Sequence, residues 1–304
     1  LYYNEGYILV KIDRPQVYVS PDKKNLFITL RVEEGEKFDV GKIDFEGDLL
    51  FPEDELRSTI EIDDSKTFVY SLMQKDLQKV TEKYGDLGYA FANVIPKVRP
   101  NESTRKVDIT FEIDKGHKVY FGKINIVGNS KTRDKVIRRE LKIIEGELYN
   151  ETRKRESLEN VQRLGYFDEI HFNNNTPEDR QDILNIDIVV KERNTGTIQI
   201  GAGYSTYSGA VFQGQINQIN FLGRGQKLGI NIDVSKKRSV YNFNFTEPAF
   251  MDTDWSVGGD AYQRKDLLTD WDKTVKGGAL RLGHPLAEYL SGFLRYSLDE
   301  TEVK

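Results

Sequence analysis

The stretch Phe38-Asp39-Val40-Gly41-Lys42-Ile43-Asp44-Phe45-Glu46-Gly47 has a similar counterpart later in this chain of 304 residues. It returns as Val119-Tyr120-Phe121-Gly122-Lys123-Ile124-Asn125-Ile126-Val127-Gly128, so both of its glycines recur after 81 positions. A second landmark, a Gly-Tyr pair, stands at Gly6-Tyr7, Gly88-Tyr89 and Gly165-Tyr166. Self-similarity at a nearly fixed period predicts consecutive copies of one structural unit.

Each complete copy reads as strand, short helix, long helix, strand, strand. In the first copy, Val40 to Phe45 alternates like a strand, and Pro52 suits the first turn of a short helix that ends near Ile60. Ser71 with Gln74 resembles a capping box at the start of the long helix. Apolar residues at helical spacing predict one buried face on that helix: Met73, Leu77, Val80 and Tyr84.

The first copy closes with two predicted strands, Tyr89 to Val98 and Lys106 to Ile113, separated by the turn-rich Pro100-Asn101-Glu102-Ser103. The second copy follows the same order of elements. Its predicted parts are a strand at Val119 to Val127, helices at Thr132 to Leu141 and Asn150 to Leu164, and strands at Tyr166 to Phe172 and Ile183 to Val190.

Residues 1–36 match only the tail of a unit, with strands expected at Ile8 to Ile12 and Leu26 to Val32 around the turn Pro21-Asp22. We therefore expect the tail of a module over 1–36, complete modules over 37–116 and 117–194, and a different domain over 195–304. A unit of about 80 residues is large enough to hold a small core of its own.

After Asn194 the hydrophobic period changes to two. Leu228, Ile230, Ile232 and Val234 alternate with polar residues and glycine, and the same holds around Ile198 to Tyr204. Seven strands are expected, near 197–206, 209–220, 226–235, 239–247, 254–265, 273–283 and 289–299. Aromatic residues are expected near the strand ends, as in the girdles of membrane barrels: Trp255, Tyr262, Trp271, Tyr289 and Phe293.

Two architectures share this alternation, a transmembrane β-barrel and a soluble β-sandwich. Long strands, a second face rich in Gly, Asn, Gln and Ser, and the aromatic positions favour the barrel. An open sheet leaves edge N–H and C=O groups unpaired in lipid, so seven strands form only part of a barrel. The predicted fold class is α+β repeats of β-α-α-β-β order followed by an all-β segment, the N-terminal part of a transmembrane antiparallel barrel.

Composition excludes several functions. The chain has no cysteine, and its formal net charge of -5 comes without a basic run, so neither a thiolate site nor nucleic-acid binding is expected. His117, His171 and His284 are scattered without metal-ligand spacing. No glycine-rich phosphate loop opens a helix. We expect no enzyme activity, no cofactor and no metal.

The two complete units resemble POTRA domains, the periplasmic modules that precede the barrel in the BamA-type outer-membrane assembly superfamily. The resemblance rests on Gly41 to Gly47, Gly122 to Asn129, and the Leu-Gly-Tyr sequences that end at Tyr89 and Tyr166. Three downstream segments resemble turns of the family's barrel: Ile219-Asn220-Phe221-Leu222-Gly223-Arg224-Gly225, Phe245-Thr246-Glu247-Pro248-Ala249-Phe250 and Gly283-His284-Pro285-Leu286.

The resemblance implies a location in the outer membrane, with the POTRA domains in the periplasm. It implies insertion of barrel proteins as the function. The implied partners are unfolded outer-membrane proteins, periplasmic chaperones, accessory assembly lipoproteins and outer-membrane lipid.

Two sets of residues are candidate sites for pairing with a client strand. The first barrel strand would template the client, as the resemblance implies, through Thr197, Ile198, Gln199, Ile200, Gly201, Ala202, Gly203 and Tyr204. The edge strands of the modules would add a client strand by β-augmentation, around Tyr89, Phe91, Val94, Tyr166, Phe167 and Ile170. For any single module strand, completing its own sheet is the simpler interpretation.

Three functional hypotheses remain open from the sequence. The first is a barrel-protein insertase. The second is a relative within the same superfamily, either a TamA-like assembly factor or a two-partner secretion pore. The third is a soluble periplasmic binding protein with tandem modules and a β-sandwich.

Overall fold

The computed structural model describes residues 2–268, 271–287 and 290–304, without the side chain of Asp64. The chain forms two compact units. The first comprises Leu1–Lys123, Ile143–Arg155 and Thr176–Asn185, and the second comprises Ile124–Lys142, Glu156–Asn175 and Ile186–Lys304. The second unit thus joins part of the second module to the C-terminal sheet.

The N-terminal segment consists of short pieces: η1 (Tyr2–Glu5), β1 (Lys11–Ile12) paired with β4 (Val32–Glu33), and β2 (Gln16–Val19) paired with β3 (Leu26–Thr29). The observed strands β1 and β3 are therefore shorter than the strands expected at Ile8 to Ile12 and Leu26 to Val32. Every residue of β2 and β3 is exposed, including the aromatic residues Tyr18 and Phe27. That this segment is the tail of a further module stays a prediction.

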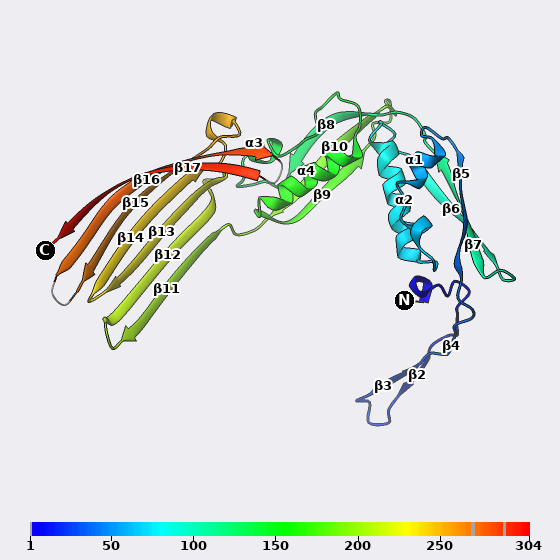
Figure 1. Cartoon of the computed structure of the whole chain (residues 1–304), viewed down its shortest axis with the longest axis horizontal. Helices are drawn as coiled ribbons and strands as arrows, with labels where there is room; N and C mark the ends of the chain where they lie inside the picture. Colours follow the sequence, from blue (N-terminus) through cyan, green and yellow to red (C-terminus); the bar gives the residue numbers. More distant parts are fainter. Residues whose placement is uncertain (1, 269–270, 288–289) are drawn as a thin grey trace. The chain divides into compact units, whose positions relative to one another are not determined.

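The first module has the predicted order of elements. It contains β5 (Asp39–Gly47), α1 (Glu53–Arg57), η2 (Ile62–Asp64), α2 (Tyr70–Gly85), β6 (Asn93–Asn101) and β7 (Lys106–Asp114). The strand order is β5-β7-β6, with β5 parallel and β6 antiparallel to the central β7. Helix α2 lies along one face of this sheet (Figure 1).

The core of the first module follows from the two hydrophobic periods. Alternate residues of β7 are buried, and Phe111 stacks on Phe45 of β5 with ring centroids 5.4 Å apart. On α2, Met73, Val80 and Tyr84 are buried and Leu77 is partly buried, which confirms the predicted face. Burying one such side chain contributes about 1.5–3 kcal/mol.

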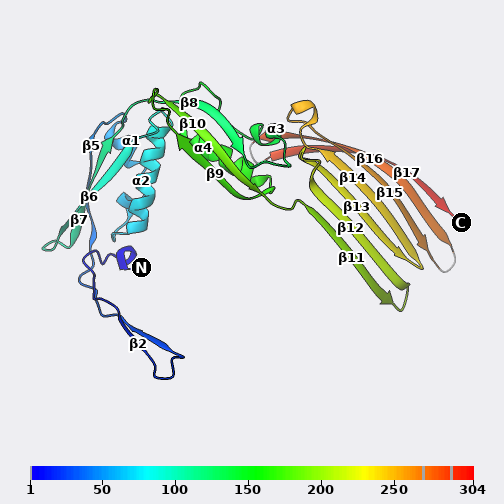
Figure 2. The same cartoon turned by 180° about the vertical axis from the view of Figure 1, so that it is seen from behind.

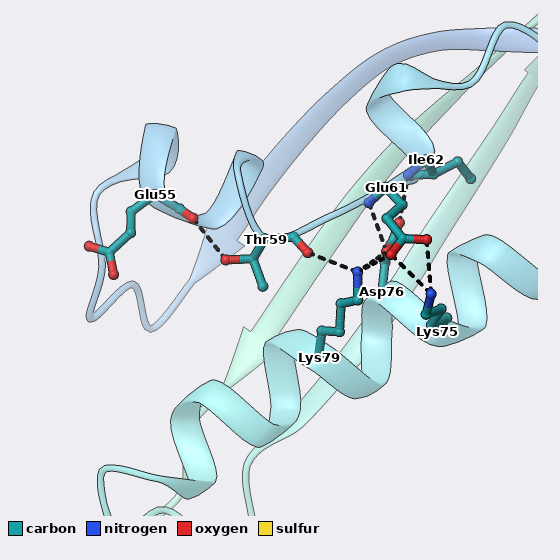
Figure 3. Close-up of polar contacts among 7 residues, drawn as sticks. All are labelled: Glu55, Thr59, Glu61, Ile62, Lys75, Asp76 and Lys79. Carbon is teal, nitrogen blue, oxygen red and sulfur yellow. Dashed lines mark hydrogen bonds and ion pairs between the residues drawn. The ribbon is translucent and has the colours of Figure 1, made fainter. Parts of the chain in front are cut away.

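Asp76 is a fully buried carboxylate on the same helix (Figure 3). Its two oxygens accept hydrogen bonds from the backbone N–H groups of Glu61 and Ile62, at 2.9 and 2.8 Å. Lys79 lies beside it, 2.7 Å from Glu61 and 3.9 Å from Asp76. The carboxylate fixes the connection between α1 and α2, because it satisfies two N–H groups that the short η2 leaves free.

The predicted capping box is wrong. Helix α2 begins at Tyr70 after Val69, and no side chain of its own first turn caps it. The N–H of Ser71 instead donates to Oδ1 of Asn4 at 2.9 Å. The cap thus comes from a segment 67 residues earlier, which local spacing does not reveal.

The second module repeats the plan with β8 (Tyr120–Val127), α3 (Asp134–Arg138), α4 (Glu151–Arg163), β9 (Phe167–Asn175) and β10 (Ile183–Glu192). Its strand order is β8-β10-β9. The start of α4 is capped by Asn150, whose Oδ1 accepts from Arg153 N at 2.7 Å. Asp86, which follows α2 of the first module, accepts from Thr152 N at 2.8 Å and from its hydroxyl at 2.7 Å.

The C-terminal segment forms one antiparallel sheet whose strands follow each other in chain order (Figures 1 and 2). Its elements are β11 (Gly196–Ser205), β12 (Gly209–Phe221), β13 (Gln226–Ser235), β14 (Arg238–Glu247), η3 (Phe250–Asp252), β15 (Ser256–Leu267), β16 (Asp272–Ala287) and β17 (Leu290–Val303). The seven predicted strands are confirmed. The turn predicted at Gly283 to Leu286 is wrong, because these residues continue β16, with a register shift between Pro285 and Ala287.

The register separates an apolar face from a polar face. Ile230 of β13 pairs with Ile216 and Phe243, and Leu280 of β16 pairs with Tyr296, so apolar residues lie side by side across strands. Gln, Asn, Asp and Arg side chains occupy the other face. No helix in residues 2–268, 271–287 and 290–304 is long and apolar enough to cross a membrane.

The aromatic girdle is only partly as expected. Trp255 and Trp271 lie directly before β15 and β16. Tyr262 and Phe293 are in register with Gly277 and Gly283 on the polar face, so they do not belong to a girdle on the apolar one. Tyr262 instead donates a hydrogen bond to Asp299. Tyr289 lies outside the described residues.

Candidate functional site

Strand β11 lies at the end of the seven-stranded sheet, so one of its edges has no strand neighbour in the described chain. All eight residues predicted for client pairing, 197–204, lie in it. The N–H of Ile219 donates to the carbonyl of Thr195 at 3.1 Å, just before β11 begins. Backbone groups of alternate residues point to opposite edges. Since the β11–β12 register is unbroken, the odd-numbered residues bond to β12.

The outward-facing backbone groups of β11 therefore belong to Ile198, Ile200, Ala202 and Tyr204. Their side chains lie on the apolar face, where Ile200 is 88% and Tyr204 is 81% exposed. Two of the three glycines of this strand, Gly201 and Gly203, are not required by packing. A Cβ at Gly203 would meet nothing within 4 Å, and one at Gly201 would make only ordinary contact with Gln213. Among the described residues this edge is thus unpaired, apolar on one side and weakened by Gly201 and Gly203.

The module edges were predicted only in part. β6 and β9 are the outer strands of their sheets, and Val94, Phe167 and Ile170 lie in them. Tyr89 and Phe91 do not, because a turn between α2 and β6 holds them, with Ala92 N donating to Tyr89 O at 3.1 Å.

Tyr166 also lies outside the strand. It is buried just before β9, and its carbonyl accepts from Arg193 N at 2.9 Å. Its hydroxyl donates to the carbonyl of Gly225 at 3.4 Å, in the turn between β12 and β13. Burial raises the pKa of this hydroxyl, so it stays a donor at neutral pH. Tyr166 therefore belongs to a contact between the second module and the sheet.

This contact, the module–sheet junction, is formed by residues 130–133, 166 and 192 of the module and residues 220–225 of the sheet, all in the second compact unit. Gly223 adopts a φ of +68° and accepts a hydrogen bond from Arg133 N at 2.9 Å. A Cβ at Gly223 would lie 1.9 Å from the carbonyl oxygen of Lys131. Only glycine allows the two backbones to approach this closely.

Side-chain hydrogen bonds complete the junction. Asn220 and Thr132 are both buried, and Asn220 Nδ2 donates to Thr132 Oγ1 at 2.8 Å. Asn220 Oδ1 accepts from Gly225 N at 2.8 Å. One buried amide thus holds its own turn and ties it to the module, and the loss of either bond would leave a buried polar group unpaired.

Glu192, at the end of β10, organises the module side. Its carboxylate accepts from Thr132 N at 2.6 Å, Lys131 N at 2.9 Å and Ser130 Oγ at 2.8 Å. Partial burial alone would raise the pKa of this carboxyl, but these hydrogen bonds outweigh burial and hold the pKa below its ordinary value.

Sequence reasoning missed the junction residues Thr132 and Glu192. The paired glycines 223 and 225 were the one available signal, since partners 60 to 90 positions apart show no spacing pattern.

The described residues contain no group of three or more His, Asp or Glu side chains that could hold a metal ion. Two of the histidines make aromatic contacts, His117 with Phe91 and His284 with Trp255. His117 also lies 2.9 Å from the carbonyl of Gln181 through Nε2.

Comparison with protein families matches residues 38–116 and 119–193 to the POTRA family, described as a surface antigen variable number repeat. Residues 220–304 match the Omp85 superfamily domain. The chain belongs to the POTRA–Omp85 family.

Curated relatives of this POTRA–Omp85 chain are outer membrane protein assembly factors named BamA. That of Nitratidesulfovibrio vulgaris is 32% identical over 304 residues, which cover 99% of this chain and 38% of the relative. That of Neisseria meningitidis is 30% identical over 296 residues, covering 95% of this chain and 37% of the relative. The chain thus spans less than two fifths of either relative.

A solved structure supports the fold. BamA from Haemophilus ducreyi lacking POTRA domains 1–3 superposes with a TM-score of 0.73 at 26% identity, over 88% of this chain and 52% of that one. The POTRA3–5 structure of Haemophilus influenzae BamA covers 63% of this chain and 76% of its own, with a TM-score of 0.57 at 24% identity. The architecture of POTRA modules followed by a large antiparallel sheet is therefore shared with BamA.

Proposed function

We propose that this chain is part of an outer-membrane protein assembly factor that inserts β-barrel proteins. Its sheet lies in the outer membrane and its POTRA modules lie in the periplasm. Its clients are unfolded outer-membrane proteins, delivered by periplasmic chaperones, and accessory assembly lipoproteins bind the modules. The observation that carries this proposal is the order of the domains: two POTRA modules are followed directly by a seven-stranded antiparallel sheet with one apolar face, and β11 is its first strand.

The two faces of the sheet fit this location. Residues such as Ile200, Phe243 and Leu280 form an apolar surface that suits hydrocarbon, and the opposite face carries the charged and amide side chains. Lipid contact removes the apolar face from water. Backbone pairing removes the strand edges from hydrocarbon, where an unpaired N–H or C=O group costs several kcal/mol.

Strand pairing itself supplies the driving force. Four outward-facing residues of β11 offer their N–H and C=O groups to an arriving strand, and each hydrogen bond contributes roughly 1 kcal/mol net. Such pairing depends on backbone hydrogen bonds and not on the identity of the side chains, so one edge can bind clients of different sequence. The same edge releases a finished client because glycines weaken its pairing.

The test is folding of a urea-denatured barrel protein into liposomes that contain the protein, followed by its protease-resistant fraction. Ile200→Pro removes one outward N–H from β11 and leaves the β11–β12 ladder intact, so we expect slower client folding. Gln199→Pro is the matched control, because it breaks the ladder to β12 and reports damage to the sheet itself.

Acceleration over empty liposomes that Ile200→Pro abolishes would support templating by β11. Unchanged acceleration in a folded Ile200→Pro variant would contradict it. Release of a soluble passenger, or a steady ion conductance without any acceleration, would contradict the insertase and favour a secretion pore.

A further inference from the structure

The two POTRA modules present four outer strands in the described chain: β5 and β6 in the first module, β8 and β9 in the second. The backbone of an outer strand accepts an added strand only where its N–H and C=O groups are free. The four edges differ in this respect.

The β5 and β8 edges are partly covered by the chain itself. Val40 N donates to Lys66 O at 3.0 Å and Phe68 N donates to Phe38 O at 3.0 Å, so residues 66–68 run along β5. In the second module Phe121 N donates to Glu147 O at 2.8 Å and Tyr149 N to Val119 O at 3.0 Å. An incoming strand would have to displace these segments.

The β6 edge is interrupted by two prolines. Pro96 and Pro100 pair in register with Phe111 and Val107 of β7, without a bulge. Proline has no N–H, so an unbroken ladder places these two positions with their nitrogens away from β7. The outward positions of β6 are then 94, 96, 98 and 100, and half of them have no donor. Proline on an edge strand is a known obstacle to further pairing.

The β9 edge has no such obstacle. Its nine residues, Phe167–Asn175, include no proline, so each carries an N–H. Phe167 is buried and Ile170 and Phe172 are half-buried, while Asn173, Asn174 and Asn175 are exposed. At about 3.3 Å per residue this edge is roughly 30 Å long, enough for a barrel strand.

We infer that β9 is the edge at which these modules accept an extended client strand, and that Pro96 and Pro100 close the equivalent edge of β6. This inference rests on the proposed function and assigns one part of it to one strand. The partner is a segment of an unfolded barrel protein with alternating apolar and polar residues. It resembles the strands of this chain's own sheet, which are 10 to 16 residues long.

The experiment uses the whole protein in detergent and a synthetic peptide with the sequence of β13, Gln226–Ser235, carrying a photoreactive benzoylphenylalanine in place of Leu228. Mass spectrometry locates the crosslinks. We expect roughly thirtyfold more crosslinks to β9 than to β6, the effect of two missing hydrogen bonds of about 1 kcal/mol each. A P96T/P100T variant restores both donors and is expected to bring β6 to the level of β9. Equal labelling of β6 and β9 in the parent, or no gain in that variant, would overturn the inference.

A matched pair of prolines tests β9 directly. Neighbouring residues of a strand direct their N–H groups to opposite edges, so Asn173→Pro and Asn174→Pro differ in which edge they affect. One of the two variants breaks the hydrogen bonds between β9 and β10, and faster hydrogen exchange of the β10 amides identifies that variant. The other removes only an outward donor and is expected to lose about five- to tenfold of the β9 crosslinks. Undiminished crosslinking in that variant would also overturn the inference.

The liposome folding assay separates the two levels. If client folding is accelerated but the peptide shows no preference for β9, the inference is wrong and the proposed function stands. If the protein gives no acceleration at all, the proposed function is wrong, whatever the crosslinking result.

Discussion

Asp76 and Ser157 lie 81 positions apart and occupy equivalent buried sites on the long helices of the two modules. Asp76 accepts from the N–H groups of Glu61 and Ile62. Ser157 Oγ accepts from Lys142 N at 2.8 Å, and Lys142 stands 81 positions after Glu61. The repeat therefore preserves a polar contact between helix and connection, although the side chain that makes it has changed.

Replacing these side chains should destabilise the modules unequally. Asp76→Ala leaves two buried N–H groups without their acceptor and should cost about 2–4 kcal/mol, whereas Ser157→Ala should cost about 1 kcal/mol. Hydrogen–deuterium exchange of the Glu61 and Ile62 amides, compared with that of Lys142, measures both effects. Asp76→Ser serves as a control, since it should recover part of the loss. Equal protection of all three amides in the alanine variants would contradict this account.

Gly223→Ala should open the module–sheet junction. The new Cβ meets the Lys131 carbonyl, which adds about 1–3 kcal/mol of steric cost to that of the left-handed backbone. Gly165→Ala is the control, because Gly165 has a similar φ of +70° and open space around its Cβ position. Protease cleavage near residue 131 should rise in the first variant only. Similar cleavage in both would show that backbone strain alone decides the result.

The junction should weaken in acid through Glu192. Its folded pKa lies below the ordinary value of 4.5, so its contribution to stability is complete above that value. The contribution is lost as pH falls through the lower folded pKa. Exchange of the Lys131 and Thr132 amides should therefore show extra opening below about pH 4.5. In Glu192→Gln this pH dependence should disappear, and a persisting dependence would assign the effect to another group.

Asp260 should hold together the polar face of β15, β16 and β17. Arg281 and Arg295 face each other in register, and the Asp260 carboxylate lies 2.9 Å from the first and 3.6 Å from the second. Like charges directly opposite each other are destabilising, so Asp260→Asn should lower the temperature at which the sheet unfolds in detergent. Asp233→Asn on the same face is the control, and Asp260→Asn/Arg295→Ser should recover stability.

The helices and strands could be predicted from the sequence because each of them has a single hydrophobic period, two residues in a strand or about 3.6 in a helix. The alternation from Leu228 to Val234 predicted β13 at its observed bounds, and the helical spacing of Met73, Val80 and Tyr84 predicted α2. The predictions that failed share one physical cause: contacts with residues distant in the sequence decide the local structure. His284-Pro285 reads locally as a turn, but the pairing of β16 with β17 extends through it.

The same limit applies to the candidate sites. Phe91 is a strand former held in a turn, and its ring lies against His117 from the next segment of the chain. The partners of Asn220 and Glu192 lie 88 and 60 positions away. A pattern within one segment carries no information about such contacts, whereas the place of β11 at the start of the sheet followed directly from the order of the predicted strands.

Asp86 has a consequence for how such chains can be cut and recombined. The first module supplies a hydrogen-bond acceptor to the helix start of the second, through Thr152. A protein engineer who divides the chain at residue 117, where the repeat ends, would separate that helix from an acceptor it uses. The boundary of the repeat in the sequence therefore differs from the boundary of the segment that stabilises the second module. A transplanted second module should include the end of α2 with Asp86.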